Sequence, residues 1–525
     1  MKIIIGTRGS DLALWQANHT KDLLEKKGVE VEIKVISTHG DRTQEWNTAF
    51  DKLEGKGFFT KELEEALLKK EIDLAVHSHK DLPTESPDGL MVGAVSDRED
   101  PSELLLIRKE NVDNKIRFNL KSGAKVGTSS ARRKSQLTAF RPDVTIEDLR
   151  GNVPTRINKL REGQYDAIML AAAGVERLGL DLSDLHVEKL DPKEFIPAPA
   201  QGVLAWQIRD NDSAIESVID KLNNEDVQMQ INVERRILNL FDGGCQLPLG
   251  AYCESEISDQ DRLVFKVWVS KAAAFDKQPV QLLFETHYPG DLPEKVVSHI
   301  NGINKQKVFV TRDFRENDYL PHALKGLNFE VEGKSLIELK EIKINFIPRT
   351  EWVFFSSKHA VRYFFRQNPT IENVKYGCIS KQTSMELRSF GKRADFIGQS
   401  TDTKLIGKQF GSLIGNARVL FPIAKESMQS IQYQLVKRDN AVNLPVYETL
   451  KHSIEVASDT TIIVFTSPSN VESFFEKNKW LPTFQAVAMG DATGSMLEKK
   501  GVKKYETPDR FDDLGLMRAI MKISV

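Results

Sequence analysis

Short apolar segments alternate with amphipathic helical segments from the start of the chain, and this alternation constrains the fold more than any other feature. Residues 2–5 include three consecutive isoleucines and precede a helical pattern over 12–23, with apolar and aromatic side chains on one face. A helical segment at 62–70 consists almost wholly of strong helix formers and precedes an apolar strand at 72–76. The alternation predicts an α/β fold with mainly parallel sheets, in which ligands bind beyond the carboxyl ends of strands.

The helix–strand pattern at 63–76 recurs at 157–169, which predicts two similar α/β lobes with a cleft between them. The Pro- and Ala-rich segment 195–202 is typical of a crossover between lobes. A smaller α+β domain follows it. We expect a first lobe at 1–100 with 200–222, a second lobe at 101–199 and the small domain at 223–302.

A second repeat has a fixed offset of 110 residues. The segment 353–365 matches 463–475, and 379–383 matches 489–493 at the same offset. Two matches at one offset predict two related α/β domains. The order of the segments fits one domain inserted into the other, with 336–339 and 445–449 as paired connectors. We expect one domain at 305–335 with 450–525 and the inserted one at 340–445.

The charge and composition exclude several classes of protein. The chain has 73 Lys and Arg against 75 Asp and Glu, which argues against a general nucleic-acid or membrane-surface protein. Its three cysteines are too few for a disulfide scaffold, and no apolar run approaches the roughly 20 residues that span a bilayer. We expect a soluble cytoplasmic protein, and a monomer is compatible with the sequence.

Six arginines lie in or beside turns rich in Gly, Ser and Thr, where strands end and helices begin. Glycine permits close backbone approach, helix N-termini favour anions, and arginine forms bidentate pairs with carboxylates or phosphates. Each arginine alone fits a solvated surface charge equally well. Together they predict a local polyanion site in the cleft. They are Arg8, Arg132, Arg133, Arg150, Arg156 and Arg177.

Asp81 follows the apolar strand 72–76 by a few residues, where a carboxylate can transfer protons to a ligand. The adjacent Lys80 could hold this carboxylate ionised or pair with a substrate. A structural role for Asp81 as a capping residue is the alternative. His77 and His79 could begin a metal site, but no third ligand is nearby and we expect no metal.

Cys245 follows two glycines in the segment 243–246, which suggests an exposed thiol suited to covalent chemistry. A buried, inert thiol is the alternative reading. Cys253 and Cys378 lie in strand-like surroundings, and we interpret both as packing residues.

The segment 50–59 contains Gly-Lys-Gly beside two phenylalanines, which suggests a lid over the cleft that includes Lys56 and Phe59. A plain surface loop explains the same residues. In the C-terminal half, Thr466 and Ser467 follow a strand and open a helix, where backbone amides bind carboxylates. Ordinary helix capping accounts for them equally.

Together these motifs resemble the hydroxymethylbilane synthase (porphobilinogen deaminase) family, in order, over residues 1 to about 300. The remainder looks like uroporphyrinogen-III synthase, on weaker signals that include the internal repeat. Consecutive activities in one chain are functionally sensible. The deaminase motifs are 6–17, 77–81, 127–133, 149–152 and 243–246, and the synthase motifs are 308–312, 446–449 and 465–467.

The first resemblance implies that Cys245 carries a dipyrromethane cofactor through a thioether. Four molecules of porphobilinogen lose ammonia and couple in turn, and hydrolysis releases hydroxymethylbilane. Asp81 would assist deamination and stabilise the developing positive charge, while Lys56 and Phe59 would belong to the lid. The residues implied to bind acetate and propionate groups are Arg8, Ser10, Ser78, Lys80, Thr128, Ser129, Ser130, Arg132, Arg133, Arg150, Arg156 and Arg177.

The second resemblance implies closure of hydroxymethylbilane to uroporphyrinogen III with inversion of the last ring, without a cofactor, and Thr466 and Ser467 as contacts. The implied architecture is a pair of periplasmic-binding-protein-like lobes with a small α+β domain, then a two-domain α/β synthase module. One departure is His79, where the family usually has an apolar residue. By strand alternation we expect it to face away from Ser78.

Two alternatives remain open. Only the deaminase half is active and the C-terminal half serves docking or regulation, or the chain is a non-catalytic two-lobed anion-binding protein. An unmodified Cys245 would favour the latter.

Overall fold

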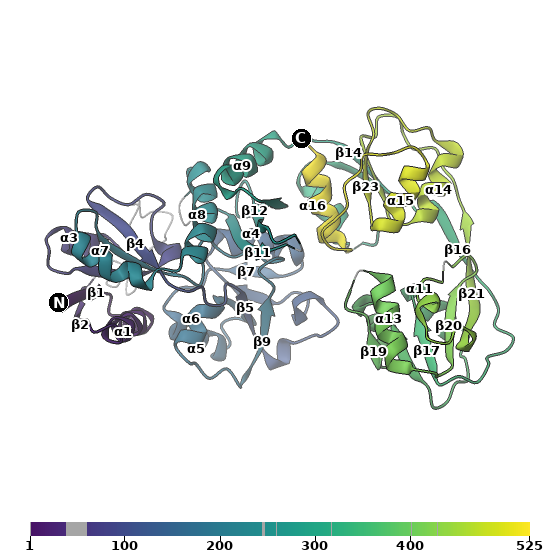
Figure 1. The fold of residues 1–525 in the computed structure, drawn as a ribbon, viewed down its shortest axis with the longest axis horizontal. Helices are drawn as coiled ribbons and strands as arrows, with labels where there is room; N and C mark the ends of the chain where they lie inside the picture. The colour runs from purple at the N-terminus through teal and green to yellow at the C-terminus, as the bar shows by residue number, and fades with distance from the viewer. Residues whose placement is uncertain are drawn as a thin grey trace. The chain divides into compact units, whose positions relative to one another are not determined.

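The computed structural model describes residues 2–37, 60–243, 247–258, 260–316, 318–400, 402–427 and 429–525. The chain forms two compact units (Figure 1). The first comprises Met1–Val308, Phe314–Glu332 and Glu506–Val525, and the second comprises Phe309–Asp313 and Gly333–Tyr505. Both units combine helices with sheets, so the predicted α/β class is confirmed. The predicted domain boundaries stay predictions.

The first sheet has the strand order β2-β1-β3-β10-β4. β1 lies parallel to β2 and β3, whereas β10 lies antiparallel to β3 and β4. Four strands of this sheet therefore point the same way, as expected of a mainly parallel sheet, and β10 runs against them. The elements are β1 (Lys2–Thr7), α1 (Asp11–Glu25), β2 (Glu30–Val35), α3 (Lys61–Leu68), β3 (Leu74–Ser78), β4 (Leu90–Val95), β10 (Leu204–Arg209) and α7 (Ser213–Ile219).

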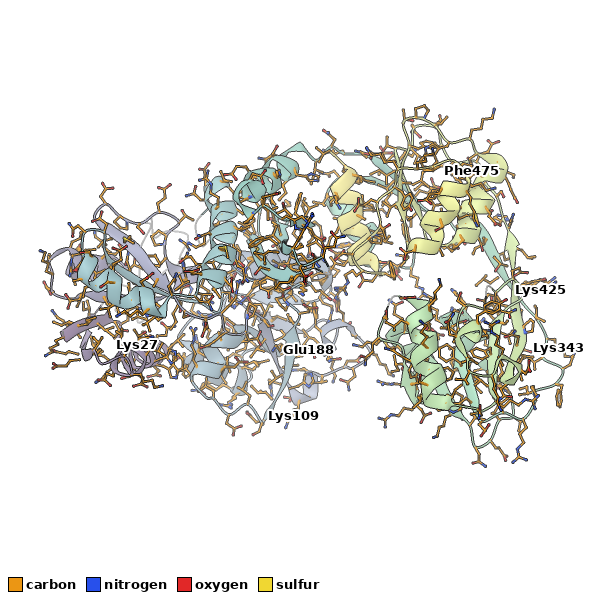
Figure 2. The ribbon with its side chains drawn as sticks, viewed as in Figure 1. Lys27, Lys109, Glu188, Lys343, Lys425 and Phe475 are labelled. Carbon is orange, nitrogen blue, oxygen red and sulfur yellow. The ribbon has the colours of Figure 1, made fainter. Side chains whose placement is uncertain are left out.

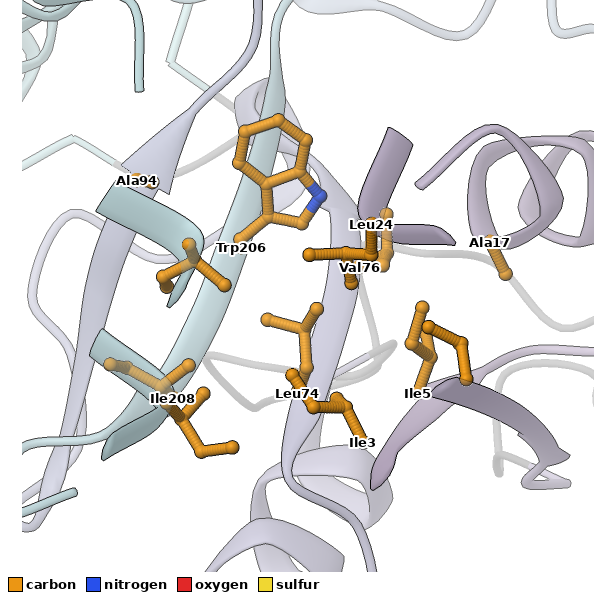
Figure 3. Close-up of a cluster of buried hydrophobic side chains, with 12 residues drawn as sticks. Ile3, Ile5, Ala17, Leu24, Leu74, Val76, Ala94, Trp206 and Ile208 are labelled. Atoms are coloured by element: carbon orange, nitrogen blue, oxygen red, sulfur yellow. The ribbon is translucent and has the colours of Figure 1, made fainter. Parts of the chain in front are cut away.

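Buried apolar side chains from distant parts of the chain join these strands. Ile3 and Ile5 from β1, Leu74 from β3, and Trp206 and Ile208 from β10 pack in one cluster (Figure 3). Trp206 is 1% exposed, and its ring nitrogen donates to a buried threonine hydroxyl of α1. This packing fixes β10 in the sheet although it follows β3 by more than a hundred residues.

The second sheet repeats the arrangement of the first, with the order β7-β6-β8-β5-β9. β6 lies parallel to β7 and β8, and β5 lies antiparallel to β8 and β9. The predicted similarity of 63–76 to 157–169 is confirmed, since both are a helix followed by a parallel strand. The elements are β5 (Glu103–Arg108), β6 (Lys125–Gly127), α4 (Ala131–Phe140), β7 (Thr145–Glu147), α5 (Val153–Arg161), β8 (Ala167–Ala171), α6 (Ala172–Arg177) and β9 (Leu185–Leu190).

The chain passes twice between the two sheets, from β4 to β5 and from β9 to β10. A third, antiparallel sheet follows, with the order β11-β12-β13, and packs against α8 and α9. α8 begins directly after Asn224, whose side chain accepts from the Val227 amide and caps the helix. The elements are α8 (Glu225–Leu240), β11 (Leu249–Ile257), β12 (Leu263–Lys271), β13 (Val280–Thr286) and α9 (Leu292–Gly302).

The predicted 110-residue repeat is confirmed in the order β-α-β-α. The first copy is β17 (Trp352–Phe355), α11 (Lys358–Phe365), β18 (Lys375–Cys378) and α12 (Lys381–Ser389). The second copy is β22 (Ile462–Phe465), α14 (Pro468–Lys477), β23 (Gln485–Ala488) and α15 (Asp491–Lys499). Phe475 at the end of α14 packs against the buried cluster of its copy (Figure 2).

The two predicted connectors form an antiparallel pair, β16 (Ile337–Glu341) and β21 (Ala441–Lys451), in which Leu339 lies opposite Thr449. They join the six-stranded sheet β16-β21-β20-β17-β18-β19, and a four-stranded sheet has the order β15-β14-β22-β23. No described helix is both long and apolar enough to cross a bilayer. The remaining elements are β14 (Lys307–Val310), α10 (Tyr319–Gly326), β15 (Glu330–Gly333), β19 (Phe396–Ile397), α13 (Thr403–Ile414), β20 (Val419–Ala424) and α16 (Asp513–Ile523).

Candidate active site

Several predicted site residues follow the carboxyl ends of β1 and β3, which share one edge of the first sheet. Arg8 is half-buried just after β1, and the Ser10 hydroxyl accepts from the Ala13 amide at 3.4 Å and caps α1. Ser78 is the last residue of β3, and its hydroxyl accepts a hydrogen bond from the side-chain amide of Gln16 at 2.8 Å. The fold thus brings the motifs 6–17 and 77–81 together at one edge of the sheet. Ligands commonly bind at this edge, where the carboxyl ends of parallel strands meet.

A 3₁₀ turn, His79–Asp81, follows β3 directly and carries the two central polar residues. Asp81 is exposed, whereas Lys80 is half-buried and donates to the Gln201 side chain at 3.3 Å. Burial lowers the pKa of Lys80, and the charge of Asp81 opposes this shift. Lys80 therefore pairs electrostatically with its neighbour at the sheet edge.

Arg132 and Arg133 converge on a buried carboxylate that the sequence analysis did not identify. Glu103 is 0% exposed and accepts from Arg132 at 2.6 Å and from Arg133 at 2.7 Å. Burial alone would raise the pKa of Glu103, but the charges of Arg133 and Arg132 outweigh it and lower the pKa to about 2. Both arginines were predicted to bind substrate carboxylates. Each uses one terminal nitrogen to bind the internal carboxylate of Glu103.

Gln201 links the two sheets through this ion pair. Its side-chain oxygen accepts from Lys80 of the first lobe, and its nitrogen donates to Pro101 O at 2.8 Å and to Glu103 at 3.3 Å. Gln201 is fully buried. The sequence does hold one sign of this role, because Glu103 is an isolated acid at the start of the apolar strand β5. A charge buried there requires counter-charges. Nothing in the sequence indicated that Gln201 would bind both Lys80 and Glu103.

The hydroxyl residues of the second sheet mainly organise its backbone. The Ser130 hydroxyl accepts from the Arg133 amide and caps α4, and the buried Thr128 hydroxyl accepts from the Ser130 amide at 3.4 Å. The exposed Ser129 hydroxyl exchanges hydrogen bonds with the backbone of Leu149 at 3.0 and 3.1 Å. These contacts hold the turn after β6 against the segment that leads to α5.

Arg156 interacts electrostatically with charged residues that follow strands of both sheets. Burial, then the charge of Arg133, lowers its pKa to about 10, while Asp81 opposes the shift. Its Nε donates to Gly151 O at 2.6 Å, and Arg150 nearby is half-buried. Asp81 after β3 of the first sheet is therefore brought near Arg133 and Arg156, which lie on helices beside the second sheet.

Arg177 occupies a different place, at the passage between the sheets. Its Nε pairs with Glu99 at 2.9 Å, its terminal nitrogen donates to Gly202 O at 3.0 Å, and its guanidinium lies 5.6 Å from the Trp15 ring centroid. Burial lowers its pKa. Its described contacts tie the two crossing segments together.

β3 ends at Ser78 and His79 begins the 3₁₀ turn, so the expectation that His79 faces away from Ser78 stays a prediction. It is 3% exposed and lines a cavity of about 480 Å³ together with residues of α8, including Arg235. Burial is the main cause that lowers its pKa to about 3. His77 is also buried, with a pKa lowered to about 4, and contacts Gln207 at 3.1 Å.

Cys245 and the predicted lid residues Lys56 and Phe59 lie outside the described residues. The chain is described up to Gly243, where an added Cβ would lie 2.6 Å from Leu247 and 2.8 Å from Leu238. Only glycine fits this approach without displacing its neighbours. The start of the predicted cofactor loop is therefore a tightly packed turn after α8.

In the second unit, Thr466 and Ser467 are engaged with neighbouring segments. The Thr466 hydroxyl donates to Thr311 O at 3.0 Å, and the Thr466 amide donates to the Thr311 hydroxyl at 3.0 Å. The Ser467 hydroxyl accepts from the amide of Asn470 and caps α14. A further hydroxyl pair, Ser357 with Tyr447 of β21, has an O···O distance of 3.3 Å. The sequence analysis did not select Tyr447 as a site residue.

Comparisons with known proteins agree with the two resemblances. A family model described as porphobilinogen deaminase, dipyromethane cofactor binding domain, matches residues 3–217. A second, described as uroporphyrinogen-III synthase HemD, matches residues 322–518. The crystal structure of uroporphyrinogen-III synthetase from Helicobacter pylori aligns at 18% identity and a TM-score of 0.32, over 41% of this chain and 98% of that chain.

Curated porphobilinogen deaminases are much more similar in sequence. That of Sulfurimonas denitrificans is 47% identical over 252 residues, which are 47% of this chain and 78% of the relative. That of Nitratiruptor sp. is 47% identical over 250 residues, 48% of this chain and 78% of the relative. The chain therefore belongs to the porphobilinogen deaminase family of enzymes, with a dipyrromethane cofactor binding domain followed by a uroporphyrinogen-III synthase domain, a fusion of two domains of tetrapyrrole biosynthesis.

Proposed function

We propose that the first half condenses four porphobilinogen molecules to hydroxymethylbilane on a dipyrromethane attached to Cys245, and that the second half closes this product to uroporphyrinogen III. One observation carries the proposal most strongly. Asp81 from the end of β3 is coupled electrostatically to Arg156 of the second lobe, in a cluster with Lys80 and Arg133. A carboxylate beside excess cations suits a reaction on a carboxylated pyrrole.

The cluster has positive charge available for substrate carboxylates. It contains four cations, Lys80, Arg132, Arg133 and Arg156, against the two carboxylates Glu103 and Asp81. The Nε of Arg133 is buried without a hydrogen-bond partner among the described residues. Because like charges destabilise one another, the mutual repulsion of Arg133 and Arg156 is relieved when an anion binds between them. Acetate and propionate groups fit this requirement.

Asp81 is the group we assign to the chemistry. Its exposed carboxylate stands at the ligand-facing edge of the first sheet, next to Lys80. There it can hold a proton for the departing amine and stabilise positive charge that develops on the substrate. Lys80 orients the substrate carboxylate, while Gln201 restrains Lys80. Glu103 keeps Arg132 and Arg133 in fixed positions, which is the preorganisation that catalysis by positioning needs.

The residues present fit the cofactor. The cationic cluster complements the carboxylates of a dipyrromethane, and Cys245 follows the packed turn at Gly243 by two residues in the sequence. When bound, the dipyrromethane supplies the pyrrole carbon to which further units add. The chain's contribution is to anchor its carboxylates through Arg133 and Arg156 and to keep Asp81 beside the site of addition.

We further propose that the two lobes of the first half form the two-lobed architecture implied by the resemblance, with boundaries at 1–100 with 200–222 and at 101–199. The repeated strand orders and the double passage between the sheets support it. In the second half, positioning of the folded substrate is the expected source of catalysis. We retain Thr466 and Ser467 as its contacts, although their hydroxyls also bind within the protein.

Intact-mass measurement and porphobilinogen turnover test the proposal together. The purified chain should exceed its sequence mass by two condensed pyrrole units and release ammonia from porphobilinogen. The Cys245→Ser variant should have the unmodified mass and no turnover. An unmodified wild-type chain, or a variant that still carries the adduct, would refute the attachment site.

A further inference from the structure

One side chain of α8 holds the turn that carries Asp81. The guanidinium of Arg235 donates through one terminal nitrogen to His79 O at 3.2 Å and to Leu82 O at 3.3 Å. Through the other it donates to Leu82 O at 3.4 Å and to Pro83 O. One of these carbonyls precedes Asp81 in the chain and two follow it, so Arg235 forms hydrogen bonds with the turn on both sides of Asp81.

One side of this turn borders a cavity. The cavity of about 480 Å³ lies between Leu82, Pro83 and Thr84 on one side and α8 residues that include Arg235 and Asn239 on the other. Groups that face a cavity lack van der Waals partners on that side. On the side of the cavity, the hydrogen bonds of Arg235 therefore supply restraint that packing does not.

The charge of Arg235 is compatible with its surroundings at neutral pH. Burial and then the charge of Arg235 lower the pKa of His79 to about 3, so this imidazole is uncharged and does not repel the guanidinium. A carbonyl cluster is a suitable acceptor for arginine, whose planar donors reach several oxygens at once.

The helix that carries Arg235 is itself anchored. The adjacent Glu234 is 0% exposed and binds Arg98 at 2.7 and 3.0 Å and the Ala200 amide at 2.6 Å. α8 ends at Leu240, three residues before the packed turn at Gly243. One rigid element therefore holds the Asp81 turn and leads into the loop with Cys245.

We propose that Arg235 is a positioning residue, which fixes the turn that carries Asp81 against α8. This inference rests on the proposed function. A misplacement of about 1 Å at a reacting group costs roughly 100-fold in rate. Removing the guanidinium should thus lower kcat for porphobilinogen by about 10–100-fold. KM should change by less than about twofold, because Arg133 and Arg156 belong to the second lobe and stay in place.

The experiment compares Arg235→Met, which keeps the apolar stem but no donors, with Arg235→Lys, which keeps donors and charge. Arg236→Met is the matched control, since Arg236 is the next residue of α8, exposed and paired with Glu294 at 2.9 Å. Each full-length protein is checked for its adduct by intact mass, and kcat and KM for porphobilinogen are then measured. We expect a kcat loss in Arg235→Met, partial recovery in Arg235→Lys and wild-type values in Arg236→Met.

Other outcomes overturn the inference. Unchanged kcat in Arg235→Met, a loss confined to KM, an equal loss in Arg236→Met, or failure of Arg235→Met to acquire the adduct would each contradict positioning. A kcat in Arg235→Lys no higher than in Arg235→Met contradicts it as well. A wild-type chain without adduct or turnover defeats the proposed function instead, so the two failures are distinguishable.

Discussion

Glu234 and Arg98 form a bidentate ion pair at 2.7 and 3.0 Å, and their side chains are 0% and 8% exposed. The pair ties α8 to the passage from β4 to β5. Glu234 also accepts from the backbone amides of Ala200 and Cys253, at 2.6 and 2.7 Å. One carboxylate thus joins four segments, including both crossings between the sheets.

We predict that Glu234→Gln destabilises the first unit by about 3–5 kcal/mol, because it leaves the buried Arg98 charge without its partner. Calorimetric unfolding of the full chain measures this loss. Glu294→Gln is the control, since it breaks the exposed pair with Arg236 and should cost at most about 1 kcal/mol. Equal effects of the two substitutions would contradict the role of burial.

Gly202 should not tolerate a side chain. Its φ is +89°, and an added Cβ would lie 2.4 Å from Glu99 O. Gly123→Ala is the matched control, because Gly123 also has a positive φ, +73°, but nothing lies within 4 Å of its added Cβ. The control should cost about 1 kcal/mol from backbone strain alone. Gly202→Ala should lower the unfolding temperature clearly further, and equal shifts would show that the close approach is unimportant.

His79 should make stability depend on pH. Its pKa in the folded state is lowered to about 3, below the ordinary value, so the unfolded chain binds the proton more readily as pH falls below about 6.5. The wild type loses about 1.4 kcal/mol per pH unit through this group below that point, and the neutral form keeps full stability above it. The stability of His79→Leu minus that of the wild type should therefore be more favourable at pH 5.5 than at pH 7.5. A difference independent of pH, measured by thermal unfolding, would contradict the buried neutral imidazole.

Asp81→Asn should reduce porphobilinogen consumption at least about 100-fold, because the carboxylate that transfers the proton is lost. The unfolding temperature should not change, since Asp81 is exposed. Asp88→Asn alters another exposed acid of the following loop and should retain full turnover. Substantial turnover in Asp81→Asn would rule out the assigned role.

Much of the fold could be predicted because it is encoded locally or by repetition. The 110-residue repeat and the pairing of 336–339 with 445–449 needed only sequence matches, and the structure places them in equivalent strands and helices. The antiparallel direction of β10 could not be predicted, since it depends on the burial of Trp206 and Ile208 against strands over a hundred residues earlier.

The site was predictable in its residue types and not in their partners. The motifs identified Asp81 and the arginines, but the counter-charge Glu103 and the grip of Arg235 arise from contacts between distant segments. The burial of His79 could not be predicted from strand alternation, because His79 opens the 3₁₀ turn directly after β3. Such contacts leave no periodic trace in the sequence.

The most direct test of the whole account is incubation of the purified chain with porphobilinogen alone, followed by oxidation and chromatographic separation of the uroporphyrin isomers. If both halves act in one polypeptide, type III uroporphyrin should predominate. Predominant type I would mean that the linear product closes without the second half, and the absence of any porphyrin would contradict the deaminase activity itself.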